Sequence, residues 1–159
     1  MGTFEISRVV KATPEQVWRV VTDWGGYVRW MPLTKIRQDP GETRVGWSFA
    51  GLTGVGRLRF SDSMVLTDWS PPVQGSGTFR LVKTGRLLGG WAQVRVSPAA
   101  DPGGAPGTRA TRLDWRERIT VRPAPLGALV DPVLSPLNKR LFTSVIAAMA
   151  AEAEQGPTR

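Results

Sequence analysis

The chain has 159 residues, of which 41% are hydrophobic, and this suits a single domain with its own core. It contains neither histidine nor cysteine, which excludes disulfides, thiol nucleophiles, Cys/His zinc sites and every catalytic dyad or triad built on histidine. The formal net charge of +8 is compatible with a nucleic acid, an anionic membrane or an anionic ligand as partner, and equally with a basic surface that only reflects GC-rich codons.

The N-terminal part predicts a strand followed by two short helices. Residues 4–11 are rich in β-branched side chains, which are typical of a strand. Thr13 can cap a helix that begins at Pro14, and Gln16 completes a capping box. A second short helix is expected over residues 27–30, where it stops before a proline.

The middle of the chain predicts about six strands, separated by turn residues. They are expected over residues 34–38, 45–50, 57–69, 78–84, 87–96 and 108–121. Residues 51–56 are rich in glycine but lack the Gly-Lys-Ser/Thr ending of a phosphate-binding loop, so they are interpreted as a loop between strands. Residues 97–107 are rich in Pro, Gly and Ala and predict a mobile hairpin loop.

The C-terminal part predicts helix from Pro123 onward. Pro132 should end or kink a first helical piece, because proline cannot donate the hydrogen bond that continues a helix. Ser135 can then cap a second, longer piece. Its apolar stripe includes Leu137, Leu141 and Val145, and we expect this stripe to face the sheet.

Two carboxylates interrupt apolar strand faces. Asp62 stands between Phe60 and Met64 on one face, and Glu117 follows Trp115 on another. A charge among apolar groups is costly unless it is paired, hydrated or functional. These two residues therefore indicate either a cavity that holds water or ligand, or a structural feature such as an ion pair or a bulge that turns one carboxylate outward.

If Asp62 and Glu117 line a cavity, Arg95 or Arg80 are the expected partners. One carboxylate could then have a raised pKa and act as a general acid or base, so Asp62 and Glu117 are the candidate catalytic residues. Tryptophan suits ligand pockets because it combines a large apolar area with one polar group, although an ordinary core also contains it. The tryptophans in or near segments that could face a cavity are Trp24, Trp30, Trp47, Trp91 and Trp115.

A resemblance to a known family rests mainly on two N-terminal runs. These are Ala12-Thr13-Pro14-Glu15-Gln16-Val17-Trp18 and Asp23-Trp24-Gly25-Gly26-Tyr27-Val28-Arg29-Trp30-Met31-Pro32. Together with the strand around Trp115 and the C-terminal helix, they resemble the START/Bet v 1-like superfamily, especially its polyketide cyclase/dehydrase and lipid-transport branch. The resemblance implies an α+β helix-grip fold. In this fold a curved antiparallel sheet of about seven strands wraps a long C-terminal helix, and two short helices follow the first strand. It implies one domain over residues 1–155 and a frayed tail over 156–159.

The resemblance and the strand faces together predict that the protein binds or transports a small hydrophobic, lipid- or polyketide-like ligand in an internal cavity. The expected ligand-binding residues are Trp30, Leu58, Phe60, Asp62, Met64, Trp91, Gln93, Arg95, Trp115, Glu117, Leu137, Leu141 and Val145. One alternative is a polyketide cyclase/aromatase or dehydratase that uses the cavity carboxylates. Another is a protein whose basic surface contacts an anionic membrane or another partner.

Further expectations concern cofactors, partners and location. No cofactor or metal is expected, because no motif for either is present. Nucleic acid is not the expected partner, because exposed aromatic residues do not alternate with the arginines of the outer strand faces. The N-terminal residues lack the pattern of a signal peptide and no apolar run could span a bilayer, so a cytoplasmic location is expected.

Overall fold

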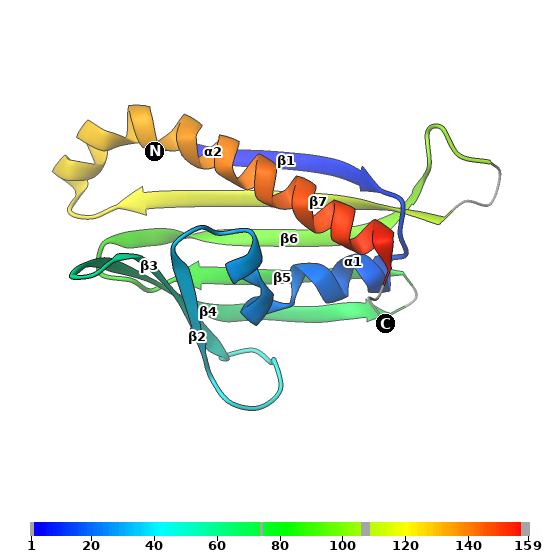
Figure 1. Cartoon of the computed structure of the whole chain (residues 1–159), viewed down its shortest axis with the longest axis horizontal. Helices are drawn as coiled ribbons and strands as arrows, with labels where there is room; N and C mark the ends of the chain where they lie inside the picture. The colour runs from blue at the N-terminus through cyan, green and yellow to red at the C-terminus, as the bar shows by residue number, and fades with distance from the viewer. Residues whose placement is uncertain (1, 74, 106–108, 157–159) are drawn as a thin grey trace.

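A computed structural model describes residues 2–73, 75–105 and 109–156. Seven antiparallel strands form one sheet in the order β1-β7-β6-β5-β4-β3-β2, and the long helix α2 crosses one face of it (Figure 1). The elements are β1 (Gly2–Val10), α1 (Pro14–Val21), the 3-10 helix η1 (Trp24–Arg29), β2 (Thr34–Gln38), β3 (Ser48–Val55), β4 (Leu58–Val73), β5 (Ser76–Lys83), β6 (Leu88–Ala100), β7 (Arg109–Val121) and α2 (Ala124–Gln155). The predicted helix-grip fold is confirmed.

The predicted capping box begins α1. The Gln16 backbone N–H donates to Thr13 Oγ1 at 3.3 Å, and the Thr13 N–H donates to Gln16 Oε1 at 2.8 Å. The second helix begins at Trp24, earlier than predicted, because Asp23 Oδ1 accepts a hydrogen bond from the Gly26 N–H at 3.1 Å. Both helices pack on the same side of the sheet as α2 (Figure 1).

The predicted loop over residues 51–56 is wrong. Most of this segment belongs to β3, which pairs with β4 from Ser48 to Val55. Gly54 has φ +135°, and a Cβ atom there would lie 2.0 Å from the Leu58 carbonyl oxygen. The glycines therefore serve a tight hairpin within the sheet, where only glycine adopts the backbone conformation without strain.

Two other boundaries differ from the prediction because proline is tolerated at irregular positions. Strand β4 continues through Pro71 and Pro72, where its pairing with β5 shifts register. Helix α2 is continuous through Pro132 and Pro136, so neither ends it. Figure 1 shows the first turns of α2 bent away from the rest, as expected where proline interrupts the hydrogen bonds of a helix.

The core lies between the sheet, α1 and the C-terminal half of α2. Phe79 and Val94 from the sheet, Trp18 from α1, and Ile146 and Met149 from α2 are all buried there. The N-terminal half of α2 carries exposed apolar side chains instead. Between the sheet and the middle of α2, the core side chains leave a space unfilled.

Some predictions concern segments that the structure covers only partly. Strand β6 runs on to Ala100, into the predicted loop of residues 97–107, while residues 106 and 107 lie outside the described part. The mobility of that loop stays a prediction, as does the frayed tail, of which 157–159 also lie outside. In the part of the chain that the structure describes, no helix is both long and apolar enough to cross a bilayer.

Candidate functional site

A cavity of about 190 Å³ lies between the inward face of the sheet and α2. Its wall is mostly apolar, and the charged side chains among its described lining residues are Asp62, Lys83 and Glu117. The lining residues are Tyr27, Met31, Thr34, Ile36, Phe49, Gly51, Thr53, Phe60, Asp62, Met64, Leu81, Lys83, Leu88, Ala92, Trp115, Glu117, Ile119, Asn138, Leu141 and Phe142. An apolar cavity with a few convergent polar groups is the usual form of a ligand site.

The three charged groups form one connected cluster. Lys83 Nζ lies 2.6 Å from Asp62 Oδ2 and 3.3 Å from Glu117 Oε1. The Trp115 indole N–H donates to Glu117 Oε2 at 3.0 Å. We call Asp62, Lys83 and Glu117 the charged triad; its lysine joins carboxylates from two strands that are not neighbours in the sheet.

Strand alternation and small residues bring the triad together. Asp62, Lys83 and Glu117 stand on the inward faces of β4, β5 and β7, with β6 between the lysine and the glutamate. In β6, Gly90 pairs with Lys83 and Ala92 pairs with Glu117, so little side-chain volume separates the two. A Cβ atom on Gly90 would lie 1.9 Å from the Arg118 carbonyl oxygen, so glycine is required at that position.

Burial and neighbouring charges shift the pKa values of Lys83 and Glu117. Burial alone would lower the pKa of Lys83, but the negative charges of Glu117 and Asp62 outweigh it, so the pKa is raised and the ammonium stays charged. Burial raises the pKa of Glu117, and the opposing effects of Lys83 and the Trp115 hydrogen bond do not cancel it. The cavity therefore holds a fixed cation beside a carboxyl group that takes up a proton more readily than a free glutamate.

One acceptor of the triad has no partner within the protein. Asp62 Oδ1 is buried and is the only buried side-chain N or O atom without a hydrogen-bond partner among the described residues. The other oxygen of the same carboxylate is held by Lys83. A buried polar atom without a partner is expected to meet a ligand or solvent group.

The structure brings some predicted ligand residues to the cavity and keeps others away. Those that line it are Phe60, Asp62, Met64, Trp115, Glu117 and Leu141. Val145 is buried in the core, and Trp30 is half-buried and packs against the core. Leu58 and Leu137 stand in the same strand and helix as lining residues but are 87% and 58% exposed, beyond the cavity.

The predicted inward orientation of Trp91, Gln93 and Arg95 is wrong. These residues lie on the outer face of β6, because the alternate row that contains Ala92 and Val94 is the buried one. The predicted pairing of the carboxylates with Arg95 or Arg80 is also wrong: Arg80 is exposed, and its guanidinium lies 5.2 Å from the centroid of the Trp91 ring. The aromatic ring is thus covered by a cation on the outside of the sheet.

Lys83 and Tyr27 are the ionisable residues among the lining residues that the sequence analysis missed. Lys83 follows Phe79 and Leu81 on the inward face of β5, so it carries the same signal as Asp62, a charge in an apolar row. Tyr27 comes from η1, and its hydroxyl donates to the Val21 carbonyl at 2.8 Å. Burial, with the charges of Glu117 and Asp23, raises the pKa of Tyr27 far above its usual value.

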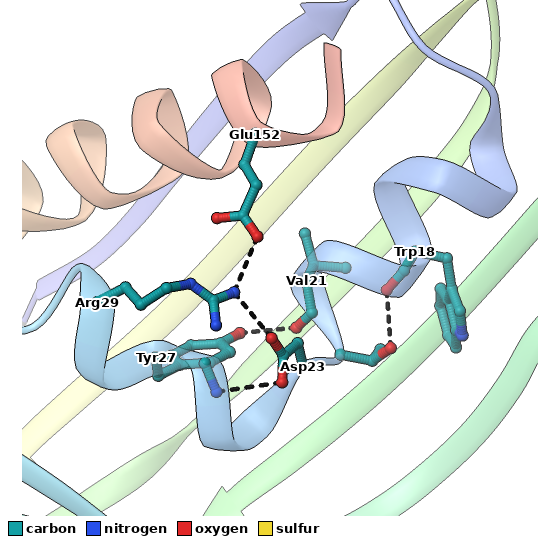
Figure 2. A network of polar contacts seen from close by, with 8 residues as sticks. Trp18, Val21, Asp23, Tyr27, Arg29 and Glu152 are labelled. Carbon is teal, nitrogen blue, oxygen red and sulfur yellow. Dashed lines mark hydrogen bonds and ion pairs between the residues drawn. The ribbon is translucent and has the colours of Figure 1, made fainter. Parts of the chain in front are cut away.

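A polar network outside the cavity holds η1 against the end of α2 (Figure 2). The Arg29 guanidinium lies between two carboxylates, 2.8 Å from Asp23 Oδ2 and 2.9 Å from Glu152 Oε1. Its pKa is raised, chiefly by the hydrogen bond to Asp23. Because Tyr27 stands between Asp23 and Arg29 in the chain, this network also positions a wall of the cavity.

Comparison with known proteins identifies the same architecture elsewhere. Residues 1–154 match the family described as polyketide cyclase / dehydrase and lipid transport. No curated protein sequence matches the chain. Similar solved structures share the fold at low sequence identity. The Zhui aromatase/cyclase from Streptomyces sp. R1128 has a TM-score of 0.65 and 16% identity, covering 97% of this chain and 94% of that one.

Two further solved structures have the same arrangement. The protein TTHA0849 from Thermus thermophilus has a TM-score of 0.70 and 11% identity, covering 99% of this chain and all of that one (100%). A START superfamily protein from Mycobacterium smegmatis has a TM-score of 0.58 and 12% identity, covering 96% of this chain and 97% of that one. At these identities the similarity concerns the fold.

Proposed function

The chain belongs to the polyketide cyclase/dehydrase and lipid transport family, and we propose that it binds a small hydrophobic molecule in the cavity between the sheet and α2. The observation that carries this proposal is an apolar cavity whose charged groups all meet in the triad. Apolar burial supplies affinity, and the triad orients the polar end of the ligand. The proposal covers both a carrier and a sensor of such a molecule, because either would bind it in this cavity.

The cavity volume sets the size of the ligand. An engineered apolar cavity of about 150 Å³ takes up benzene, so the cavity of about 190 Å³ suits one or two small rings or a short chain. A larger lipid or polyketide would place only one end here. Phe60, which lines the cavity and is 40% exposed, would then contact the remainder.

A cavity-filling variant tests this proposal. Gly51 faces the cavity, and a Cβ atom there makes only ordinary contacts, 3.6 Å from Thr34 Cγ2 and 4.0 Å from Ile36 Cδ1. Gly51→Leu should therefore fold and lose binding of 2-naphthol, measured by calorimetry and tryptophan fluorescence. Gly103→Leu, at a glycine with open space around it, is the matched control. Equal binding by both variants contradicts the proposed site.

Catalysis is the second candidate function, and the triad is the observation that favours it. A charged lysine beside a carboxyl group of raised pKa can hold and move a proton without histidine. The reaction class in keeping with the family is cyclisation or dehydration of a polyketide-like chain, whose folding the cavity would restrict. A structural neighbour is named an aromatase/cyclase.

Amide substitutions separate catalysis from binding. If the protein is a cyclase or dehydratase, Asp62→Asn or Glu117→Gln abolishes turnover of a linear poly-β-keto thioester while the substrate still binds. Asp68→Asn, at an exposed aspartate of the same strand β4, keeps full turnover. Product formation by both cavity variants at the wild-type rate rejects these catalytic roles.

Contact with an anionic membrane is supported by exposed apolar residues at one end of the molecule. Leu58 in the β3–β4 hairpin and Leu129 in α2 are 87% and 77% exposed, and both elements reach the same end of the molecule in Figure 1. Arg57 and Arg59 flank Leu58, and Arg122 precedes α2. Apolar side chains among arginines match the chemistry of an anionic lipid surface.

Vesicle sedimentation tests the membrane contact. Leu58→Ser should reduce sedimentation with phosphatidylglycerol vesicles, and the binding should weaken as salt is raised. Val73→Ser is the matched control, because Val73 is 77% exposed at the far end of β4, at the opposite end of the sheet. Equal sedimentation of both variants rejects this surface.

A further inference from the structure

The strongest hydrogen-bond donors that line the cavity already have acceptors within the protein. The Lys83 ammonium has three N–H bonds, and it lies 2.6 Å from Asp62 Oδ2, 3.3 Å from Glu117 Oε1 and 3.8 Å from Met64 Sδ. The Trp115 indole N–H donates to Glu117 Oε2. A ligand therefore meets a cation and an indole whose hydrogens already point at protein acceptors.

The hydroxyl groups of the cavity are engaged as well. The Tyr27 hydroxyl donates to a backbone carbonyl of α1 at 2.8 Å. The hydroxyls of Thr34 and Thr53 lie 2.8 Å apart, and Thr34 Oγ1 is also 3.2 Å from the Pro32 carbonyl oxygen, so both hydrogens have acceptors. Asn138 is the remaining polar residue of the described lining; its amide offers both a donor and an acceptor and does not discriminate.

One strong acceptor without a partner remains among the lining residues that the structure describes. Asp62 Oδ1 is buried without a protein donor, while its companion oxygen is held by Lys83. A carboxylate oxygen in an apolar cavity gains more from a hydrogen bond than an exposed one does. The group that fits beside Asp62 Oδ1 is therefore an O–H or an N–H of the ligand.

The charges that line the cavity also disfavour an anionic ligand. The triad has two carboxyl groups and one ammonium, and no further charged side chain stands among the described lining residues. An anionic ligand would bring a third carboxylate into a site whose cation is already shared by two. Like charges in a buried site strongly disfavour each other.

We infer that the cavity selects apolar molecules that end in a hydroxyl or amine group, and that it rejects carboxylates of the same size. This inference rests on the proposed ligand-binding function. It narrows the ligand class to alcohols, phenols and amines, and it excludes free fatty acids and aromatic acids as the molecules that fill the site.

Four naphthalene probes of similar size test the inference on the full-length protein. They are 2-naphthol, 2-naphthylmethylamine, 2-methoxynaphthalene and 2-naphthoate, with affinities measured by calorimetry near neutral pH. We expect 2-naphthol to bind at least about ten-fold more tightly than 2-methoxynaphthalene, which lacks the donor, because a hydrogen bond to a charged group adds at least that much. The amine should bind at least as tightly as 2-naphthol, and the carboxylate more weakly than the ether.

Each outcome has a separate meaning. If no probe binds, the proposed ligand-binding function fails, and the selectivity fails with it. If the ether or the carboxylate binds as tightly as the alcohol, the cavity binds ligands but the inferred selectivity is overturned. These comparisons use only the wild-type protein, so they test the inferred ligand selectivity even if a variant fails to fold.

An Asp62→Asn variant tests the atom that is invoked. Lys83 should keep the amide oxygen of the asparagine, which places the amide NH₂ where Asp62 Oδ1 stood and turns a free acceptor into a donor. The preference for 2-naphthol over 2-methoxynaphthalene should then disappear, and 2-naphthoate should bind more tightly than to the wild type. Asp68→Asn, on the same strand outside the cavity, should keep the wild-type order. An unchanged order in Asp62→Asn overturns the role of Asp62.

Discussion

Replacing Lys83 by methionine should leave the two cavity carboxylates without their shared cation. The Lys83 and Glu117 side chains are 3% and 2% exposed, so water cannot easily replace the ammonium beside Glu117. The Asp62 side chain is 19% exposed and can regain part of its hydration. Methionine keeps the length of the apolar stem, so the loss of charge is the main change.

The magnitude follows from the burial of the pair. Breaking a buried ion pair by removing one partner costs about 3–5 kcal/mol, and the partial exposure of Asp62 favours the lower value. For a domain of this size, about 3 kcal/mol lowers the melting temperature by roughly 6–12 °C. The loss should shrink as the pH falls from 7 toward 5. Glu117 without Lys83 binds a proton more tightly in the folded state than in the unfolded state, so protonation stabilises the folded variant.

Urea unfolding, followed by circular dichroism across this pH range, measures the effect. The control is Arg116→Met, which removes an exposed cation 3.5 Å from Glu5 Oε2 and should change the unfolding free energy by less than about 1 kcal/mol. Adding Glu117→Gln to Lys83→Met should restore most of the lost stability, because the more deeply buried of the two uncompensated carboxylates is gone and Trp115 keeps an acceptor. A loss below about 1 kcal/mol at neutral pH would refute the idea that Lys83 neutralises a buried charge.

Three further outcomes concern Tyr27, Arg29 and the alkaline behaviour of Lys83. Tyr27→Phe should lower the unfolding free energy by about 1–2 kcal/mol in urea, because the Val21 carbonyl loses its donor, and an unchanged value would contradict the hydrogen bond. Arg29→Met should lower it by about 1 kcal/mol at low ionic strength and by little in molar salt, since the Arg29 side chain is 44% exposed. The pKa of Lys83 is raised above 10.5 in the folded state. The contribution of Lys83 to the unfolding free energy should therefore persist up to pH 10.5 and be lost as the pH rises through the pKa of Lys83 in the folded state. The stability difference between wild type and Lys83→Met, measured in urea from neutral to alkaline pH, should then shrink only above that point.

The sequence predicted the fold well because its local signals agree with its global arrangement. The capping box at Thr13, the strand rows and the long apolar stripe of α2 each indicate the element that forms. The boundaries that failed lie where glycine and proline are used inside elements. Gly54 permits a tight hairpin, which is visible only in the tertiary structure. Of the two outcomes expected at Pro132, an end or a kink of the helix, the end is wrong, because α2 continues through it.

The candidate site was predicted only in part, because strand alternation locates a side chain on a face but not beside a partner. Asp62 and Glu117 were found as charges in apolar rows, and both line the cavity. Finding Lys83 as their partner requires the register of four strands and the small side chains of β6. The inward orientation predicted for Trp91 is wrong. A large aromatic side chain is typical of the interior, but this one lies on the outer face of the sheet, against the Arg80 guanidinium.

The charge of the surface and the charge of the cavity have opposite signs. The chain carries a net charge of +8, yet the triad brings two carboxyl groups and one ammonium to the cavity wall. An anion is therefore attracted to the outside of the molecule but meets negative charge and engaged donors inside. A neutral or cationic molecule with an apolar body meets no such barrier in the cavity, and Asp62 Oδ1 offers its donor a partner.

The lack of histidine does not leave the cavity without proton chemistry. Lys83 and Glu117 place an ammonium and a carboxyl group 3.3 Å apart in an apolar wall. What a bound molecule undergoes there depends on whether its reactive atom reaches that pair. Under the proposed function, a ligand whose reactive atom lies away from this pair would only be bound, and one whose reactive atom reaches it could exchange a proton.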